Sequence, residues 1–167
     1  MSKINITTLY EQIYRRFDNL TPVPFDCGEL CGKLCCQGDS ESGMYLFPGE
    51  EKLFEDNSNY IVLPTDMTAG GRMVKLLVCH GPCNRTDRPL SCRIFPLIPL
   101  YRKGCTLEII HDPRANICPL THPEASGCID PMFFREVEYA FRVLVKVPEV
   151  ADFLDELSYI LEEYQIL

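Results

Sequence analysis

Cysteine is the residue type whose number and spacing give this sequence its clearest chemical signal. The chain has ten cysteines, and four of them fall within the ten residues "CGELCGKLCC" at positions 27–36. Thiolates bind zinc and iron tightly, and four of them make a closed structural site. The cysteine set therefore predicts metal binding, in preference to disulfides or to ordinary buried thiols.

The spacing separates eight candidate ligands from two other cysteines. Two groups and two single residues make up the candidate set: Cys27, Cys31, Cys35 and Cys36, then Cys79 and Cys83, then Cys92 and Cys118. Cys105 lies in an expected strand and Cys128 in an expected turn, so we interpret both as core or incidental thiols. Eight thiols equal two four-thiol sites, or one polynuclear cluster with spare ligands.

The first group has a helical spacing interrupted by glycine. Cys27, Cys31 and Cys35 are four residues apart and would share one face of a helical turn. Gly28 and Gly32 disfavour a long regular helix. We therefore expect a single turn of helix between loops.

The adjacent pair Cys35 and Cys36 poses a geometric problem. Neighbouring side chains point about 100° apart on a helix and to opposite faces on a strand. One ion would rarely take both sulfurs. Either the two residues serve different metal sites, or one of them is buried as a small apolar residue.

Several basic residues and one histidine accompany the second group. His80 follows Cys79 directly, and a side chain next to a ligand usually points away from the ion. Arg85, Arg88 and Arg93 are close by in the sequence, and cationic neighbours lower the pKa of thiols. The alternative for these arginines is pairing with surface carboxylates.

Composition limits the class of protein. The 167 residues predict one domain, 1–167, and the net charge of −8 gives no basic surface for nucleic acid. The first residues lack a signal-peptide pattern, and no apolar run is long enough to span a membrane. We expect a cytoplasmic protein, with a metal ion as its partner and no nucleic acid or membrane. The reducing cytoplasm disfavours structural disulfides. Nothing in the sequence identifies a protein partner.

Helices are predicted at both ends of the chain. Residues 6–20 place their apolar side chains on one helical face, with Thr8 and Glu11 fitting a capping box. A second helical region, about 131–165, starts at Asp130 as N-cap and is broken at Val147-Pro148. Apolar residues at helical spacing continue to Tyr164, and the opposite face carries Asp and Glu without Lys or Arg. We interpret that acidic face as solvated.

Short strands and cysteine-rich loops are predicted between these helices. The segments "GMYLF", "NYIVLP" and "RMVKLLV" have strand character, and the turn-rich "TDMTAGG" separates the last two. Two further strands are expected around Lys103-Gly104. The predicted fold class is α+β: a small, irregular, metal-stabilised domain with a cysteine-cluster core at about 27–120.

Three motifs together resemble a known family. "CGKLCC", "RPLSCRIFPL" and "ICPL" are similar to the motifs of the zinc- or iron-chelating cysteine-cluster proteins of the YkgJ family, which carry a CxxCxxCC-type motif. The resemblance covers roughly residues 27–120, although the first cluster here has three-residue gaps. The positions that match are Cys31, Cys35, Cys36, Cys79, Cys83, Arg88, Pro89, Cys92, Arg93, Phe95, Pro96, Cys118 and Pro119, preceded by Cys27.

The resemblance implies metal chelation without a specified reaction. The expected cofactor is zinc, or alternatively iron or a 4Fe-4S cluster in a redox or enzyme component. One branch of the family is similar to flagellin lysine N-methylases, but this chain is much shorter and lacks a glycine-rich nucleotide loop. We identify no catalytic motif, so whether the protein is an enzyme stays open.

Overall fold

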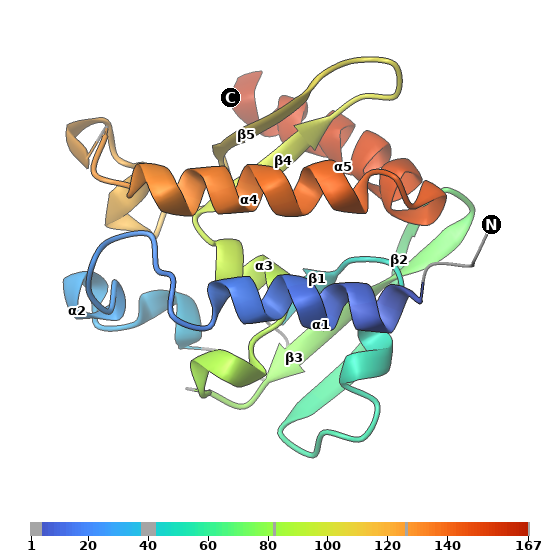
Figure 1. The fold of residues 1–167 in the computed structure, drawn as a ribbon, viewed down its shortest axis with the longest axis horizontal. Coiled ribbons are helices and arrows are strands. Elements are labelled where there is room, and N and C mark those ends of the chain that lie inside the picture. Colours follow the sequence, from blue (N-terminus) through green and yellow to red (C-terminus); the bar gives the residue numbers. More distant parts are fainter. Residues whose placement is uncertain (1–4, 38–42, 82, 126, 167) are drawn as a thin grey trace.

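The computed structural model describes residues 5–37, 43–81, 83–125 and 127–166, and it combines helices and antiparallel strands with helices at both ends (Figure 1). The α-helices are α1 (Ile6–Phe17), α2 (Gly28–Cys31), α3 (Leu90–Ile94), α4 (Pro131–Leu144) and α5 (Pro148–Ile166). The strands are β1 (Gly43–Leu46), β2 (Tyr60–Ala69), β3 (Arg72–Cys79), β4 (Leu97–Tyr101) and β5 (Leu107–His111). Short 3-10 turns are η1 (Leu34–Cys36), η2 (Glu50–Leu53), η3 (Arg85–Asp87), η4 (Pro119–Thr121) and η5 (Pro123–Ala125). The expected α+β class is confirmed.

A three-stranded antiparallel sheet has the order β1-β3-β2. The predicted separation of β2 and β3 by a long turn was wrong, because β2 continues to Ala69 and the reversal needs only Gly70 and Gly71, which have φ of 58° and 75°. The pairing register shifts between Pro64 and Thr68. Inside this irregular stretch the Thr65 hydroxyl donates to the Val74 carbonyl at 2.9 Å, which keeps β2 attached to β3.

The second sheet is the predicted hairpin of β4 and β5. Leu97 pairs with His111 and Tyr101 with Leu107, and Gly104 in the connection has a φ of 80°. Both strands are edges, which is the position where Pro99 is tolerated.

Helix α1 begins earlier than the predicted capping box. The Asn5 side chain is the cap, because its Oδ1 accepts the backbone N–H groups of Thr7 at 3.1 Å and Thr8 at 3.3 Å. The prediction that Thr8 caps the helix was therefore wrong. Tyr10 and Phe17 are fully buried on the apolar face, as the pattern predicted.

The C-terminal pair forms as expected. Asp130 caps α4 by accepting the Met132 N–H at 2.8 Å, and α5 begins at Pro148. Phe133 of α4 packs edge-on against Phe17 of α1, with ring centroids 6.1 Å apart. Tyr164 is 52% exposed, so the buried stripe of α5 ends before it.

The acidic face of α5 is exposed to solvent, as expected, and several of its carboxylates also pair within the chain. The pairs are Glu149 with Arg72, Asp152 with Lys103, and Glu162 with Arg102. In addition, Glu156 accepts the Gly70 N–H at 2.8 Å. These contacts connect α5 to the β2–β3 turn and to the β4–β5 connection.

The described residues form three hydrophobic clusters in the interior. The main core joins residues of α1, α3, α4, α5 and the β4–β5 hairpin, and it contains no cysteine among the described residues. The Val23 cluster consists of Val23, Ala115, Cys118 and Leu120, with Cys27, Phe95 and Ile129 against it. The Tyr60 cluster consists of Leu46, Phe54, Tyr60 and Leu77, with Cys79 and Cys83 among the residues against it. Within the residues that the structure describes, no helix is both long and apolar enough to cross a bilayer.

Candidate metal centre

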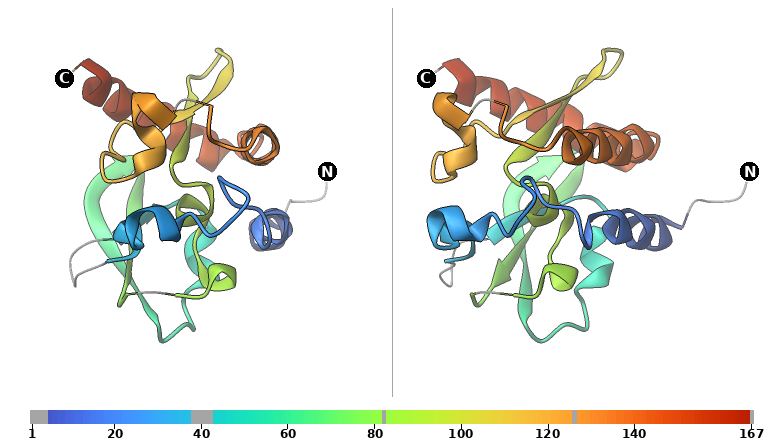
Figure 2. Two further views of the ribbon diagram at one scale, coloured as in Figure 1. Left: turned by 90° about the vertical axis from the view of Figure 1, so that its left-hand side faces the viewer. Right: turned by 60° about the vertical axis from the view of Figure 1, so that its left-hand side comes forward.

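The cysteine-bearing segments meet at one end of the molecule. In Figure 1 the segment from α2 to η1 lies at the left, beside the loop that carries η4 and η5. Figure 2 shows the same neighbourhood from that side, with the two segments adjacent in both views. Parts of the chain far apart in sequence therefore bring their thiols into one region.

A tight double turn positions the first group. Helix α2 is a single turn, as predicted, and Gly32 and Lys33 follow it with φ of 60° each before η1 begins. The Asp26 side chain accepts the Gly28 N–H at 3.0 Å at the start of the turn. A Cβ on Gly28 would lie 2.6 Å from the Lys33 side chain, so glycine allows the turn to close.

Four thiols line a small cavity of about 20 Å³, here called the Cys118 cavity. They are Cys27, Cys31, Cys35 and Cys118. The remaining walls are mostly apolar, from residues such as Phe95 and Leu120. Such a space admits roughly one water-sized particle.

Five thiols line a larger cavity of about 220 Å³, here called the Cys92 cavity. They are Cys35, Cys36, Cys79, Cys83 and Cys92. Arg88 and Tyr60 complete its polar lining near the thiols. Cys35 alone among the thiols borders both cavities.

The structure therefore gathers all eight predicted cysteines and leaves out the other two. Cys105 and Cys128 are exposed and are not among the residues that line either cavity. The expectation that Cys105 lies in a strand was wrong, because it lies in the connection between β4 and β5. His80, which follows Cys79 directly, is also exposed. All ten cysteines are free thiols.

The thiols line the cavity walls without meeting at a point. Among the described residues, no three His, Cys, Asp or Glu side chains lie close enough together to hold one ion. The Cys35 and Cys36 sulfurs are 4.0 Å apart, about twice the length of a disulfide bond. An ion would have to draw the sulfurs inward to form its coordination sphere.

Crowding makes these thiols electrostatically unusual. Desolvation raises the pKa of the Cys92 thiol, and the Cys83, Cys36 and Cys79 thiols raise it further. The hydrogen bond from Cys35 lowers the pKa of Cys36, and the positive charge of Arg88 acts in the same direction. Several thiolates in this space would repel one another, so a cation among them would be stabilising.

The Cys92 cavity also holds two hydrogen-bond donors without partners. The Tyr60 hydroxyl and Arg88 Nε are the two buried side-chain N or O atoms without a hydrogen bond among the described residues. The Cys83 thiol lies beside both groups but accepts from neither in this geometry. Leaving a buried donor unpaired costs roughly 1–3 kcal/mol.

The three arginines near the second group have different roles. Arg93 is only 1% exposed and points away from the cavity to an ion pair with Asp18 at 2.9 Å. Arg85 donates to the Phe17 carbonyl at 3.1 Å. Arg88 is the one of the three that lines the Cys92 cavity, so the predicted thiol-neighbour role fits Arg88.

The thiols that line the two cavities are ligands of the type that zinc and iron prefer. Four thiolates around a divalent ion carry a net charge of −2, which the positive charge of Arg88 would partly offset. Its free Nε and the Tyr60 hydroxyl could donate to ligand sulfurs, as outer-shell groups do in metal sites.

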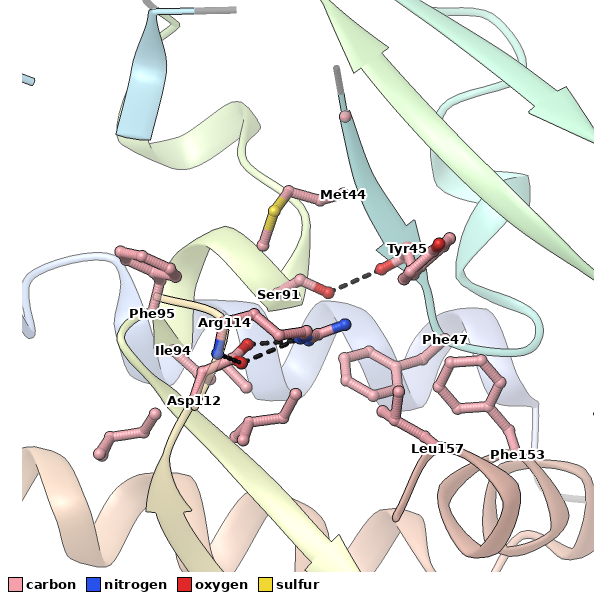
Figure 3. Close-up of a pocket in the computed structure, with 13 residues that line it drawn as sticks. Met44, Tyr45, Phe47, Ser91, Ile94, Phe95, Asp112, Arg114, Phe153 and Leu157 are labelled. Atoms are coloured by element: carbon pink, nitrogen blue, oxygen red, sulfur yellow. Dashed lines mark hydrogen bonds and ion pairs between the residues drawn. The ribbon is translucent and has the colours of Figure 1, made fainter. Parts of the chain in front are cut away.

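A separate apolar pocket of about 220 Å³ lies next to this region (Figure 3). Phe47, Phe153 and Leu157 contribute to its apolar wall. Ser91 also lines this pocket, and its hydroxyl donates to the Tyr45 carbonyl at 2.7 Å (Figure 3).

A third cavity of about 140 Å³ connects the pocket to the thiols. It shares Arg114 and Phe95 with the apolar pocket, and Cys35, Cys36 and Cys92 with the Cys92 cavity. Arg114 is paired at 2.8 Å with Asp112, which lines the apolar pocket. Sequence analysis did not find this pocket, because its walls come from four separate segments without a common motif.

Comparison of the chain with known protein families, characterised proteins and solved structures found no match in any of the three. The resemblance to the cysteine-cluster proteins therefore rests on the motif residues themselves.

Proposed function

We propose that this protein binds zinc through its eight clustered cysteines, with iron as the alternative metal. One observation carries the proposal: the eight cysteines selected by spacing line two adjoining cavities, and the two that were set aside do not. Structural zinc is commonly held by four thiolates from tight turns. The ten free thiols fit a reducing compartment such as the cytoplasm.

The bound metal would stabilise the part of the chain that packs least. The segment from α2 to η1 has exposed apolar residues, including Leu30 at 48% and Leu34 at 44%. A metal that joins this segment to Cys92 and Cys118 would contribute its binding free energy to the folding of the region.

An iron–sulfur cluster is the second candidate, and the size of the Cys92 cavity favours it. A volume of about 220 Å³ exceeds what one ion requires. Hydrogen-bond donors facing cluster sulfurs also tune the potentials of iron–sulfur proteins, and this cavity has two unused donors.

Anaerobic purification followed by metal analysis and a visible spectrum tests the proposal. A colourless protein with bound zinc supports the first candidate, and a brown protein absorbing near 400 nm supports the second. The matched control is Cys105→Ser with Cys128→Ser, which should keep the metal content of the parent. A parent that takes up neither zinc nor iron after anaerobic reconstitution refutes the proposal.

A further inference from the structure

We infer that the eight cysteines form two separate four-thiol metal sites that divide the adjacent pair Cys35 and Cys36 between them. One site consists of Cys27, Cys31, Cys35 and Cys118, and the other of Cys36, Cys79, Cys83 and Cys92. This inference rests on the proposed function and specifies how many metal centres the chain holds and which thiols serve each.

The cavities themselves give the first argument. The Cys118 cavity is lined by four thiols and the Cys92 cavity by five, and Cys35 is the one thiol common to both. Assigning Cys35 to the smaller cavity gives each cavity four thiols. The opposite assignment would leave three thiols in one cavity and five in the other.

The hydrophobic clusters give a second, independent argument. Cys118 and Cys27 pack in the Val23 cluster. Cys79 and Cys83 pack against the Tyr60 cluster. Because each cluster fixes two thiols of one set and none of the other, the two sets are attached to different parts of the framework.

Charge gives a third argument, because each set has its own arginine. Arg88 lines the Cys92 cavity, where it lies near Cys36 and Cys83. Arg85 lies near Cys27, and it is held in place by the backbone carbonyl of Phe17. Two thiolate centres would each need a compensating cation, and the fold supplies one to each.

The division also answers the geometric problem of the adjacent pair. Cys35 and Cys36 lie in one 3-10 turn, and of the two only Cys35 also lines the Cys118 cavity. Their sulfurs are 4.0 Å apart, which makes the two sites close neighbours. The assignment of the pair follows from the other six thiols, which the two cavities and the two clusters separate.

Cadmium-113 is a suitable probe, because it replaces zinc at thiolate sites and is observed directly by NMR. The parent, loaded anaerobically with this metal, should bind two ions per chain and show two resonances from sulfur-coordinated cadmium. Cys118→Ser should lose one resonance and half of the metal, and Cys92→Ser should lose the other resonance. Cys128→Ser is the matched control and should keep both.

The adjacent pair gives the sharpest comparison. Cys35→Ser should affect the resonance that Cys118→Ser removes, and Cys36→Ser the resonance that Cys92→Ser removes. The inference is overturned if both substitutions affect the same resonance, or if either Cys92→Ser or Cys118→Ser empties both sites while the circular-dichroism spectrum stays that of the parent.

The parent alone provides a test that needs no variant. Saturation at one cadmium ion per chain, with one resonance, contradicts the two sites while leaving the proposed function intact. A parent that binds no cadmium, zinc or iron refutes the proposed function itself, and the inference with it.

Discussion

Glu50 carries a carboxyl group in the interior of the protein. It is fully buried in η2, where it accepts the Leu90 N–H at 2.6 Å, the Phe47 N–H at 3.0 Å and the Tyr14 hydroxyl. Burial raises the pKa of this carboxyl from about 4.5 to about 7, and the three hydrogen bonds oppose that rise only in part. Glu50 thus connects the β1–η2 segment to α1 and to the start of α3.

The raised pKa of Glu50 predicts a loss of stability as pH rises. The folded protein binds this proton more tightly than the unfolded chain, so the contribution is complete below the unfolded pKa and is lost between about pH 4.5 and 7. The shift corresponds to about 3 kcal/mol at 1.36 kcal/mol per pKa unit. Denaturant unfolding of Glu50→Gln and the parent at about pH 5 and pH 8 measures it.

The stability of Glu50→Gln relative to the parent should increase with pH by about that amount. Glu55→Gln is the control at an exposed position of the same region. Parallel pH profiles for Glu50→Gln and the parent would show that the buried carboxyl does not titrate in this window.

At the scale of elements, Arg93 joins α3 to α1 and to η3. Its guanidinium donates to the Arg88 carbonyl at 2.7 Å and the Thr86 carbonyl, pairs with Asp18, and lies 4.2 Å from the centre of the Tyr14 ring. These contacts hold the backbone that carries Arg88 in place beside the thiols.

We expect Arg93→Ala to destabilise the fold by about 3–5 kcal/mol, because it leaves the partners of a buried cation unsatisfied. Thermal and denaturant unfolding would measure the change. Arg72→Ala is the matched control, since its pair with Glu149 is exposed and exposed pairs are worth about 0–1 kcal/mol. Equal losses in the two variants would contradict the role of Arg93.

Leu157 lies on the buried face of α5. It is 4% exposed and lies in the main core, where it also lines the apolar pocket. Leu157→Asp should lower the free energy of unfolding by a few kcal/mol, because it places a charge among apolar side chains. Tyr164→Asp, at an exposed position of the same helix, should change it little. An unchanged melting temperature for Leu157→Asp would rule out this packing.

The boundaries of helices could be predicted where only one residue of the sequence fitted the boundary. Asp130 followed by Pro131 fixed the start of α4, and Pro148 fixed that of α5. Helix α1 begins at Ile6, as the apolar pattern predicted, but it ends at Phe17 rather than at residue 20. Its cap was wrongly assigned to Thr8, because Asn5 and Thr8 both fit the cap and only the backbone distinguishes them. The segment after Pro64 looked turn-rich, but an irregular strand accommodated it through a side-chain hydrogen bond that no local pattern shows.

For the whole molecule, the candidate site and the main core occupy different parts of the structure. The gathering of the eight thiols in one region could be predicted from their type and spacing, because thiols are the side chains that zinc and iron prefer. Their division between two cavities could not, because it depends on tertiary packing around Val23 and Tyr60. The buried Arg88 Nε, which lacks a hydrogen bond among the described residues, could not be predicted either, because its burial depends on the tertiary structure.

For the proposed metal-bound form, this separation predicts the effect of removing the metal. Because the main core contains no cysteine in the described part of the chain, a chelator with reductant should leave the helical circular-dichroism signal largely intact. The segment from α2 to η1 should lose its order, and trypsin should then cut after Lys33, which is exposed. Protease digestion with mass spectrometry compares the metal-free and metal-bound forms.

Cooperative unfolding of all helices on chelation would contradict this expectation and would mean that the core depends on the metal. Readdition of zinc to the metal-free protein should restore resistance to cleavage after Lys33. Cys128→Ser should behave as the parent in both states.

The contact of α1 with α4 has a consequence for how the protein is made. The ribosome releases α1 and the first four thiols long before Phe133 and Glu136, which pack against Phe17 and pair with Arg16 at 2.6 Å. Cys118, too, is synthesised after the cysteine groups at 27–36 and 79–83. The nascent chain therefore carries unshielded thiols and an uncovered apolar helix together for most of its synthesis, an interval in which oxidation and aggregation compete with folding.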